Sequence, residues 1–362
     1  MKGDLLFKKV FGCLAGGAVG DAMGAPVEAW HYESIQQKYG KITSLIPDLG
    51  VAQKNPYEWT DDTALRHLIC RTIIRKGGRI TAYDLAEQWM IELKAGDPEG
   101  LLQKINYYSE RFSLSRIIMG VSAREAGQGN APVVDAALGI APIGIVNACH
   151  PRNAAADAYD VAGSMQWGYA QEAAMAIAAA VAEAFKPDAT IDSIIEASTT
   201  YSGPIMKRQI EKAISIAKKY DDVFEARKEF YEKLLVPDEH KMLAPIYEKT
   251  RNLPFKISIS CNPLELVPIS LAFFYIARGD PNTAMIGGTN FGRDCDGIAG
   301  FAGSIAGAYK GVDAIDLEAI KKVEEANNTD LAKLSSDMIK PVINVLQMNR
   351  ESVSALDQLI SS

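Results

Sequence analysis

The sequence predicts an all-α protein, because apolar side chains recur at helical spacing through most of the chain while the alternation typical of strands is scarce. One apolar stripe of this kind is formed by Leu65, Leu68, Ile69, Thr72 and Ile73. A second pattern follows Thr81, a residue type favoured at the start of a helix. The segment 170–184 is mostly alanine and apolar on nearly every side, so we expect a helix at the centre of the fold.

Further helical patterns predict helices over Ile191–Thr199, Ile205–Lys219, Asp222–Leu235, Pro263–Ala277, Asn282–Gly287 and Ile315–Asn327. The best strand-like patch, Lys41–Pro47, is short and has no hairpin turn beside it. No shift in composition marks a linker, and the charged stretch Lys218–Lys233 is typical of a solvated helix face. We therefore expect a single compact domain over residues 1–362.

Composition and charge narrow the class of protein. Apolar residues make up 48% of the chain and charged residues 23%, which are ordinary values for a globular protein with a sizeable core. The net charge of −7 argues against a broad nucleic-acid-binding face, and no uninterrupted apolar run is long enough to span a bilayer. The five cysteines are scattered without a CxxC pair, which disfavours zinc and iron–sulfur sites.

The N-terminal segment has one feature of a secretory signal, since Lys8 and Lys9 precede an apolar run that ends at Val19. Asp21 follows soon after, the run is rich in glycine, and no clear cleavage site is visible, so secretion is not expected. Free thiols in a reducing compartment are the simplest interpretation of the cysteines, and we predict a cytoplasmic protein.

Glycine recurs at helical spacing near both ends of the chain. The first set is Gly12, Gly16, Gly20 and Gly24, and the second is Gly297, Gly300, Gly303 and Gly307. Each glycine costs a helix about 1 kcal/mol relative to alanine, so something must compensate. Close approach by another helix backbone is the obvious compensation, and we expect both helices to pack tightly at the centre. The glycines alone leave a packing role and a direct ligand role both open.

Acidic side chains gather at the ends of the predicted helices: Asp21 and Glu28 at the first, Asp61 and Asp62 with Thr60 before the helix at 65, and Asp294 and Asp296 before the last. One acid before a helix needs no function, because Asp is a preferred N-cap. Two adjacent acids exceed what capping requires. Two such clusters supply the oxygen ligands that Mg²⁺, Mn²⁺ or Ca²⁺ take, although the pattern is not an EF-hand, a P-loop or a zinc motif.

Three segments, taken together in this order, resemble the ADP-ribosylglycohydrolase family: Gly16–Glu28, Trp59–Thr63 and Asn290–Ala299. The resemblance covers about Phe11 to Gly311. It implies an all-α fold, a compact orthogonal multi-helix bundle with a central cleft that holds two Mg²⁺ ions. A paired metal site can bind neighbouring ribose hydroxyls and orient water near the anomeric carbon.

The resemblance also implies a role for individual residues. The metal ligands would be Thr60, Asp61, Asp62, Asp294 and Asp296, for one or two Mg²⁺ ions, with Mn²⁺ also possible. Glu28 is the candidate catalytic acid or base, and Asp62 is its rival for activating water. The substrate-binding candidates are Asp21, Trp59, Gly127, Gly129, Asn130 and Trp167. Among these, Asp21 more simply supports the ligands than touches the substrate.

Two departures from the family pattern bear on the substrate. Gly297 stands where the family usually has threonine, which removes one hydroxyl ligand. The loop after Gly127 lacks the arginine of the family and carries Asp135, which would repel a diphosphate if it lies close.

We therefore predict a magnesium-dependent glycohydrolase that cleaves a ribosyl glycosidic bond, with an ADP-ribosylated protein or an ADP-ribose derivative as substrate. A smaller N- or O-riboside is the alternative, and a non-catalytic relative similar to the crystallins of this family is a third possibility. No nucleic acid or membrane partner is expected, and the oligomeric state stays open.

Overall fold

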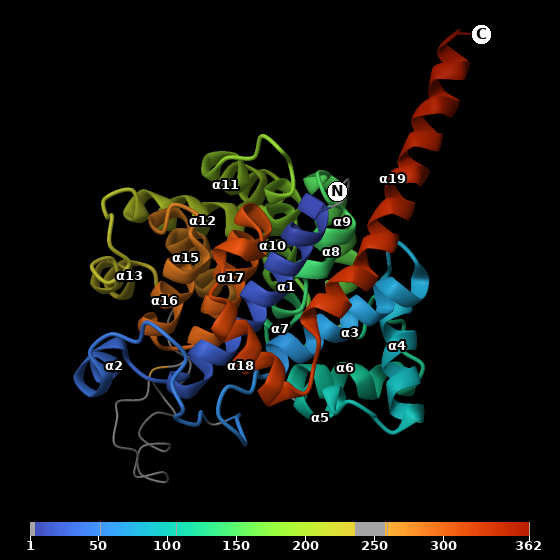
Figure 1. Cartoon of the computed structure of the whole chain (residues 1–362). Coiled ribbons are helices and arrows are strands. Elements are labelled where there is room, and N and C mark those ends of the chain that lie inside the picture. The colour runs from blue at the N-terminus through green and yellow to red at the C-terminus, as the bar shows by residue number, and fades with distance from the viewer. Residues whose placement is uncertain (1–3, 51, 106, 236–257, 259, 362) are drawn as a thin grey trace.

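The computed structural model describes residues 4–50, 52–105, 107–235, 258 and 260–361, and it is built from helices joined by loops (Figure 1). Within these ranges the β-type pairing is limited to an isolated bridge between His31 and Gly292. The all-α prediction is confirmed. The short strand-like patch Lys41–Pro47 forms an irregular loop, in keeping with the all-α prediction. Its backbone is satisfied without a partner strand, because the Asn290 side-chain amide bonds both the N–H and the carbonyl of Ile42 at 2.9 and 2.7 Å.

Two helices from opposite ends of the sequence pack at the centre, α1 (Asp4–Gly24) and α17 (Cys295–Lys310). Their backbones touch: a Cβ atom placed on Gly16 would lie 2.2 Å from the Gly303 carbonyl oxygen. At Gly20 the corresponding distance to the Ala299 carbonyl is 2.3 Å. No side chain fits at such distances, so the expected close packing of the two glycine-rich helices is confirmed.

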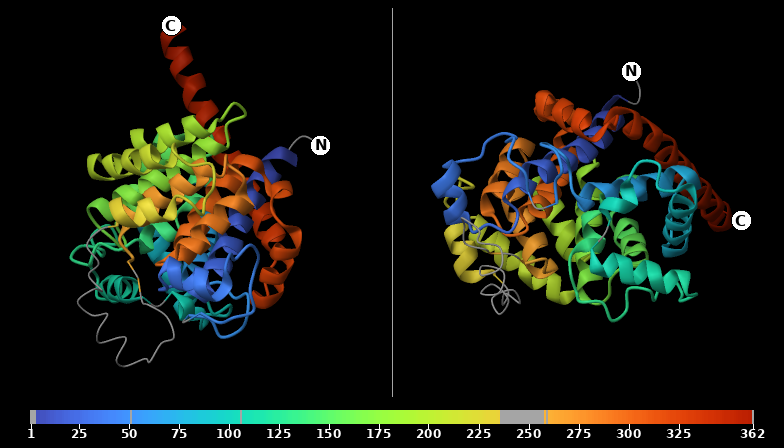
Figure 2. Two further views of the ribbon diagram at one scale, coloured as in Figure 1. Left: turned by 90° about the vertical axis from the view of Figure 1, so that its left-hand side faces the viewer. Right: turned by 90° about the horizontal axis from the view of Figure 1, so that it is seen from below.

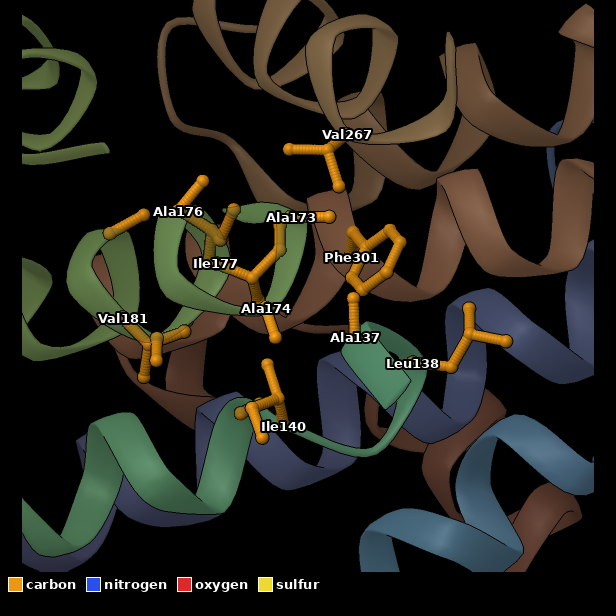
Figure 3. Close-up of a cluster of buried hydrophobic side chains, with 14 of the residues drawn as sticks. Ala137, Leu138, Ile140, Ala173, Ala174, Ala176, Ile177, Val181, Val267 and Phe301 are labelled. Carbon is orange, nitrogen blue, oxygen red and sulfur yellow. The ribbon is translucent and has the colours of Figure 1, made fainter. Parts of the chain in front are cut away.

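The alanine-rich helix α10 (Tyr169–Ala184) lies in the core, as its composition predicts. Ala174 points toward Ile140, while Ala173 points toward Phe301 of α17 (Figure 3). Around it pack α7 (Asp135–Leu138), α8 (Ala141–Val146), α9 (Pro151–Ala162), α11 (Ile191–Thr200), α12 (Pro204–Ala217) and α15 (Pro263–Ile276). Small side chains on α10 allow these neighbours to approach closely from several directions.

The first residues of α3 and α4 are set by the capping residues that precede them. Helix α3 (Asp61–Lys76) begins at Asp61, with Thr60 as N-cap, four residues earlier than the apolar stripe indicates. Helix α4 (Ala82–Ala95) begins after Thr81, whose side chain and that of Asp84 form a reciprocal capping box. The remaining helices with predicted counterparts are α13 (Arg227–Lys233), which is shorter than expected, α16 (Pro281–Phe291) and α18 (Leu317–Asn327).

Several elements were not predicted: η1 (Ala25–Val27), α2 (Tyr32–Tyr39), α5 (Leu101–Lys104), α6 (Tyr108–Ile118), α7, α8, α9, η3 (Val312–Ala314) and α19 (Leu331–Ser361). The first half of α19 packs on α1, α3 and α8, and its second half projects from the body (Figures 1 and 2). By length and composition the span Asp4–Val27 could cross a membrane, but 94% of its most apolar window is buried inside the protein. Its apolar character therefore serves the core.

Candidate functional site

One pocket forms where the C-terminal end of α1 meets the N-terminal ends of α3 and α17. Its volume is about 250 Å³, and its lining consists of Glu28, Ala29, Ala52, Asp61, Asp62, Tyr107, Asp135, Leu138, Cys261, Asp294 and Asp296. Six of these residues are carboxylic acids, and none of the described lining residues is basic. We call this the acidic pocket. It unites the two acid clusters and Glu28, which are far apart in sequence.

Asp21 holds the N-terminal end of α3 in place. Its buried carboxylate accepts hydrogen bonds from the backbone N–H groups of Thr60 and Thr63, at 2.9 and 3.0 Å, and from the Thr63 hydroxyl at 2.5 Å. Burial raises the pKa of Asp21, whereas these hydrogen bonds and the nearby Arg66 lower it. Because Asp21 and the N-cap Thr60 accept hydrogen bonds from the N–H groups at the start of α3, the side chains of Asp61 and Asp62 are not needed for capping. Asp21 does not line the acidic pocket, so its place is behind the candidate ligands.

A short backbone pairing brings Glu28 and Asp294 to adjoining segments of chain. Ala29 donates its N–H to the Arg293 carbonyl at 2.7 Å, and Arg293 donates its N–H to the Trp30 carbonyl at 2.8 Å. Gly292 has a φ of +73°, and a Cβ there would lie 2.2 Å from the Trp30 carbonyl oxygen. Only glycine fits this crossing.

The buried Arg293 side chain fixes the same segment from behind. It forms an ion pair with Glu265, and its guanidinium donates to the Ser258 hydroxyl at 2.9 Å. The other side of the pocket depends on the helix packing, since a Cβ on Gly24 would lie 2.4 Å from the backbone nitrogen of Asp296. The acids at the N-terminus of α17 are therefore held by backbone contacts and by a buried ion pair.

The carboxyl groups of the acidic pocket share an environment that disfavours negative charge. Burial, followed by repulsion from neighbouring acids, raises the pKa of Asp61 to about 6 and that of Asp296 to about 7. The same causes hold the pKa values of Glu28, Asp62 and Asp294 well above the usual range. Without a bound cation, this repulsion is offset by protonation, by the positive N-terminal ends of α3 and α17 and, at Asp61, by the charge of Lys104.

Two buried oxygen atoms in this cluster, Asp62 Oδ2 and Asp296 Oδ1, have no hydrogen-bond partner among the described residues. A buried polar atom without a partner is costly and calls for a bound group. Across the described part of the chain, no three His, Cys, Asp or Glu side chains converge as a finished metal site. Mg²⁺ does not require one, because it usually keeps several waters and binds directly through one or two carboxylates. The donor type and the unpartnered oxygens fit such an ion.

The two tryptophans expected at the cleft lie elsewhere. Trp59 is buried in the core with its ring centroid 4.7 Å from that of His67, and its carbonyl accepts from Lys104 at 2.8 Å. Trp167 is 46% exposed and donates its indole N–H to the Asn130 carbonyl at 2.6 Å. Neither lines the acidic pocket, whose aromatic ring comes from Tyr107.

The loop that begins at Gly127 has a structural role in this chain. The Asn130 side-chain nitrogen donates to the Ser109 carbonyl, the Ser113 hydroxyl and the Met165 carbonyl, at 3.1, 2.9 and 2.9 Å. Gly127 packs directly on backbone, and Gly129 has a φ of +80°, a conformation that favours glycine. Gly127, Gly129 and Asn130 do not line the acidic pocket.

Asp135 is the residue through which this region reaches the acidic pocket. It accepts a hydrogen bond from the Ser109 hydroxyl, and burial together with the charge of Asp61 holds its pKa well above the usual range. The sequence signalled Asp135 only as an unexpected acid. Tyr107 and Cys261, which also line the pocket, carry no local signal, because their approach depends on contacts between distant segments.

Gly297 stands next to Asp296, at the position where the family resemblance implies a threonine. A Cβ on this residue would be 2.8 Å from Asp294 Oδ1 and 3.0 Å from a methyl group of Leu138. The first of these contacts involves the end of a side chain that can rotate. A side chain at 297 would therefore press on the candidate ligands themselves, which is consistent with a ligand cluster adjusted to glycine.

The comparisons agree with this architecture. The family model for ADP-ribosylglycohydrolase matches residues 2–350. The uncharacterized protein YegU of Escherichia coli strain K12 is 23% identical over 353 residues, which cover 92% of this chain and 97% of that protein. An uncharacterized protein of Archaeoglobus fulgidus is 26% identical over 308 residues, which cover 83% of this chain and 87% of the relative.

A solved structure described as an ADP-ribosylglycohydrolase-related protein complex has the same fold. It is similar with a TM-score of 0.67 and 18% identity, covering 93% of this chain and 99% of the matched chain. This likeness concerns the fold, whereas the family model concerns the sequence along nearly its whole length. The protein therefore belongs to the ADP-ribosylglycohydrolase family.

Proposed function

We propose that this protein is a magnesium-dependent glycohydrolase that cleaves a ribosyl glycosidic bond of an ADP-ribosylated protein or an ADP-ribose derivative. The observation that carries the proposal is the acidic pocket, where six carboxylic acids meet without a basic residue among the described lining. A structural role does not account for this arrangement, because unpaired buried acids destabilise a fold. Membership of the family supports the reaction class.

The chain offers Asp61, Asp62, Asp294 and Asp296 as the acids that would hold the ion, whereas Thr60, the N-cap of α3, does not line the acidic pocket. Thr60 also accepts the Asp62 N–H at 3.4 Å and so helps to orient the first turn of α3. When bound, the ion would hold ribose hydroxyls and favour deprotonation of a water molecule. Asp62 is our candidate to accept a proton from such a water.

Glu28 is our candidate for the general acid. It lies in the segment after η1, is partly exposed, and lines the acidic pocket. Burial and repulsion from Asp296, Asp61 and Asp21 raise its pKa, and a protonated carboxyl group can deliver a proton to the leaving group of a glycoside.

Metal binding tests the proposal directly. Isothermal titration of the wild type with Mg²⁺ and with Mn²⁺ is expected to give saturable binding, and Asp294→Ala is expected to weaken it by at least about tenfold, because a ligand of a hard cation is removed. Asp192→Ala, an exposed acid in the first turn of α11, is the control and should bind as the wild type does. Equal affinity in the wild type and Asp294→Ala would contradict the proposal.

A smaller N- or O-riboside is a second candidate substrate, favoured by one observation. Asp135 lines the acidic pocket, so a diphosphate placed there would meet a further carboxyl group rather than a cation. The diphosphate would either be repelled or require Asp135 to stay protonated, and both alternatives cost free energy. A neutral or cationic leaving group meets no such obstacle.

Asp135→Asn separates the two candidate substrates. If Asp135 selects against phosphate, the variant should gain about tenfold in kcat/KM toward ADP-ribosyl-arginine or ADP-ribosyl-serine while simple ribosides change little, because the removed repulsion is of the order of 1–2 kcal/mol. The measurement is a side-by-side assay of these substrates with the wild type and the variant. Strong turnover by the wild type of ADP-ribosyl substrates alone would remove the smaller ribosides from consideration.

A further inference from the structure

The second half of α19 is exposed to solvent along its length. Every residue from Arg350 to Ser361 is exposed, whereas Met338, Val342 and Val345 in the first half are buried against the body. Figures 1 and 2 show this segment extending beyond every other helix. A helix of so few turns is marginal in water by itself, since most helical stability in proteins comes from packing. The segment therefore needs a partner surface.

The apolar side chains of the segment follow the spacing of a coiled coil. Val353, Leu356 and Ile360 are 60%, 57% and 76% exposed, and Leu346 lies one heptad before Val353. Steps of three and four residues place Val353 and Ile360 at a positions and Leu356 at a d position, while Asn349 occupies the preceding d position. The partner that fits this stripe is another helix with the same spacing.

We propose that residues 348–361 pair in antiparallel orientation with the same residues of a second copy of this chain, forming a two-fold symmetric dimer. In an antiparallel pair the e positions of the two helices face each other, and here they are Arg350 and Asp357. A single register places Arg350 beside the partner's Asp357 and, by symmetry, Asp357 beside the partner's Arg350. The same register packs Val353 against the partner's Leu356 on both sides of the axis and places Asn349 opposite the partner's Ile360.

Charge repulsion and the buried part of α19 both disfavour a shifted register. A shift by one heptad would place Arg350 beside the partner's Arg350, which is repulsive, and would bring the partner helix alongside Pro341 and Val342, where α19 is already buried against the body. In the chosen register residue 361 lies opposite residue 348, so the two helices overlap only along their projecting parts.

A parallel pair does not use these charges. Position e would then lie beside position g of the partner, which brings Asp357 to the partner's Ser352 and Arg350 to the partner's Val345. Neither residue makes an ion pair within the described part of the chain. Only the antiparallel arrangement gives both of them an opposite charge.

The dimer would leave the acidic pocket open. The projecting part of α19 extends from the end of the molecule where α1 begins, while the pocket lies where α1 ends (Figure 1). The inference is therefore independent of the proposed function, and catalytic activity is not needed to test it.

Sedimentation velocity of the full chain tests the proposal. Over about 1 to 200 µM we expect the 39.2 kDa monomer to convert to a species of twice that mass. Arg350→Asp and Asp357→Arg should each weaken dimerisation by at least about tenfold, because each creates two like-charge pairs, and the double variant should restore it to within about threefold. Glu351→Arg changes the charge by the same amount at an outward f position and should have no effect.

Two results would overturn the inference. One is a monomer across the whole concentration range. The other is a dimer whose dissociation constant is unchanged by either single charge reversal, which would indicate parallel pairing or contact through the body. Because all of these positions are exposed, the variants should keep the far-UV circular dichroism and thermal midpoint of the wild-type monomer, so loss of dimer cannot be attributed to unfolding.

Discussion

Replacing Asp62 with asparagine is expected to lower hydrolytic activity by about 10³-fold and, at the same time, to make the metal-free protein more stable to heat. Asp62 is buried, and its Oδ2 atom has no hydrogen-bond partner among the described residues. Its raised pKa reflects burial and repulsion from Asp296, Asp21, Asp61 and Asp294. An amide removes one charge from this cluster and can donate to the neighbouring acids. The gain should be about 1–2 kcal/mol, or roughly 1–3 °C for a chain of this length.

With excess Mg²⁺ the wild type should have the higher melting temperature, whereas in EDTA the Asp62→Asn variant should have it. In the wild type the ion is expected to raise the melting temperature through its binding free energy, while the variant with a damaged site gains little. Scanning calorimetry of both proteins with EDTA and then with excess Mg²⁺ would measure the crossing. Stabilisation of both proteins by the same amount would contradict the assignment of Asp62 to the metal site.

Asp21→Asn is the contrasting control within the same group of buried acids. Both oxygens of Asp21 accept hydrogen bonds from Thr60 and Thr63, so an amide nitrogen would face N–H and O–H donors. That variant should lose about 1–3 kcal/mol with or without metal. The opposite signs expected at Asp21 and Asp62 distinguish an acid that stabilises the fold from one that is kept despite its cost to stability.

The thermal stability of the metal-free wild type should depend on pH because the acidic pocket disfavours ionised carboxyl groups. Folding raises the pKa of Asp61 to about 6 and that of Asp296 to about 7, above the usual 3.8. A carboxyl group with a raised folded-state pKa stabilises the fold below the unfolded pKa, and that contribution is lost as pH rises through the folded pKa. In EDTA these groups should therefore contribute less to the free energy of unfolding as pH rises from about 4 to about 7, and the melting temperature should fall over the same range. Asp62→Asn should flatten the decline, because the neighbouring acids then repel one another less.

The parts of this structure that sequence predicts are those governed by local rules. Helical spacing and the Thr81 capping box determine α3, α4 and α10 without reference to the rest of the fold. The two acid clusters were also visible, because paired acids at a helix start exceed what capping requires. Their meeting in one pocket followed from the glycine spacing together with the family resemblance.

The parts that sequence did not predict depend on contacts between distant segments. Trp59 was expected at the cleft because it adjoins the acid motif, but its ring packs on His67 in the core. Asn130 was expected to contact the substrate because of its place in the loop after Gly127. Instead, its side-chain nitrogen donates hydrogen bonds to Ser109, Ser113 and Met165. Nothing in the local sequence distinguishes a free amide from a saturated one. For α19 the difficulty is different, since its buried stripe and its exposed stripe lie on different faces of one helix and no single periodicity describes both.

Gly303→Ala is expected to destabilise the protein by about 2–4 kcal/mol and to weaken metal binding, whereas Gly300→Ala, three residues earlier in the same helix, should be neutral or stabilising by up to about 1 kcal/mol. A Cβ on Gly303 would lie 2.2 Å from the Gly16 carbonyl oxygen and 2.8 Å from its carbon. Backbone cannot rotate away as a side chain can, so α1 and α17 must separate. At Gly300 the nearest atom is 3.4 Å away, which is an ordinary contact.

The effect should reach the acidic pocket, because the same helix pair positions it. Asp296 lies in the first turn of α17, against Gly24 at the end of α1, and Glu28 follows shortly after in the chain. Separating the helices at Gly303 therefore changes the distance between the candidate acid and the candidate ligands. Urea unfolding and Mg²⁺ titration of both alanine variants would measure the two consequences. A Gly303→Ala protein that loses stability but binds Mg²⁺ with wild-type affinity would show that the pocket is held independently, by Asp21 and by the Arg293–Glu265 ion pair, and not by the packing of α1 on α17.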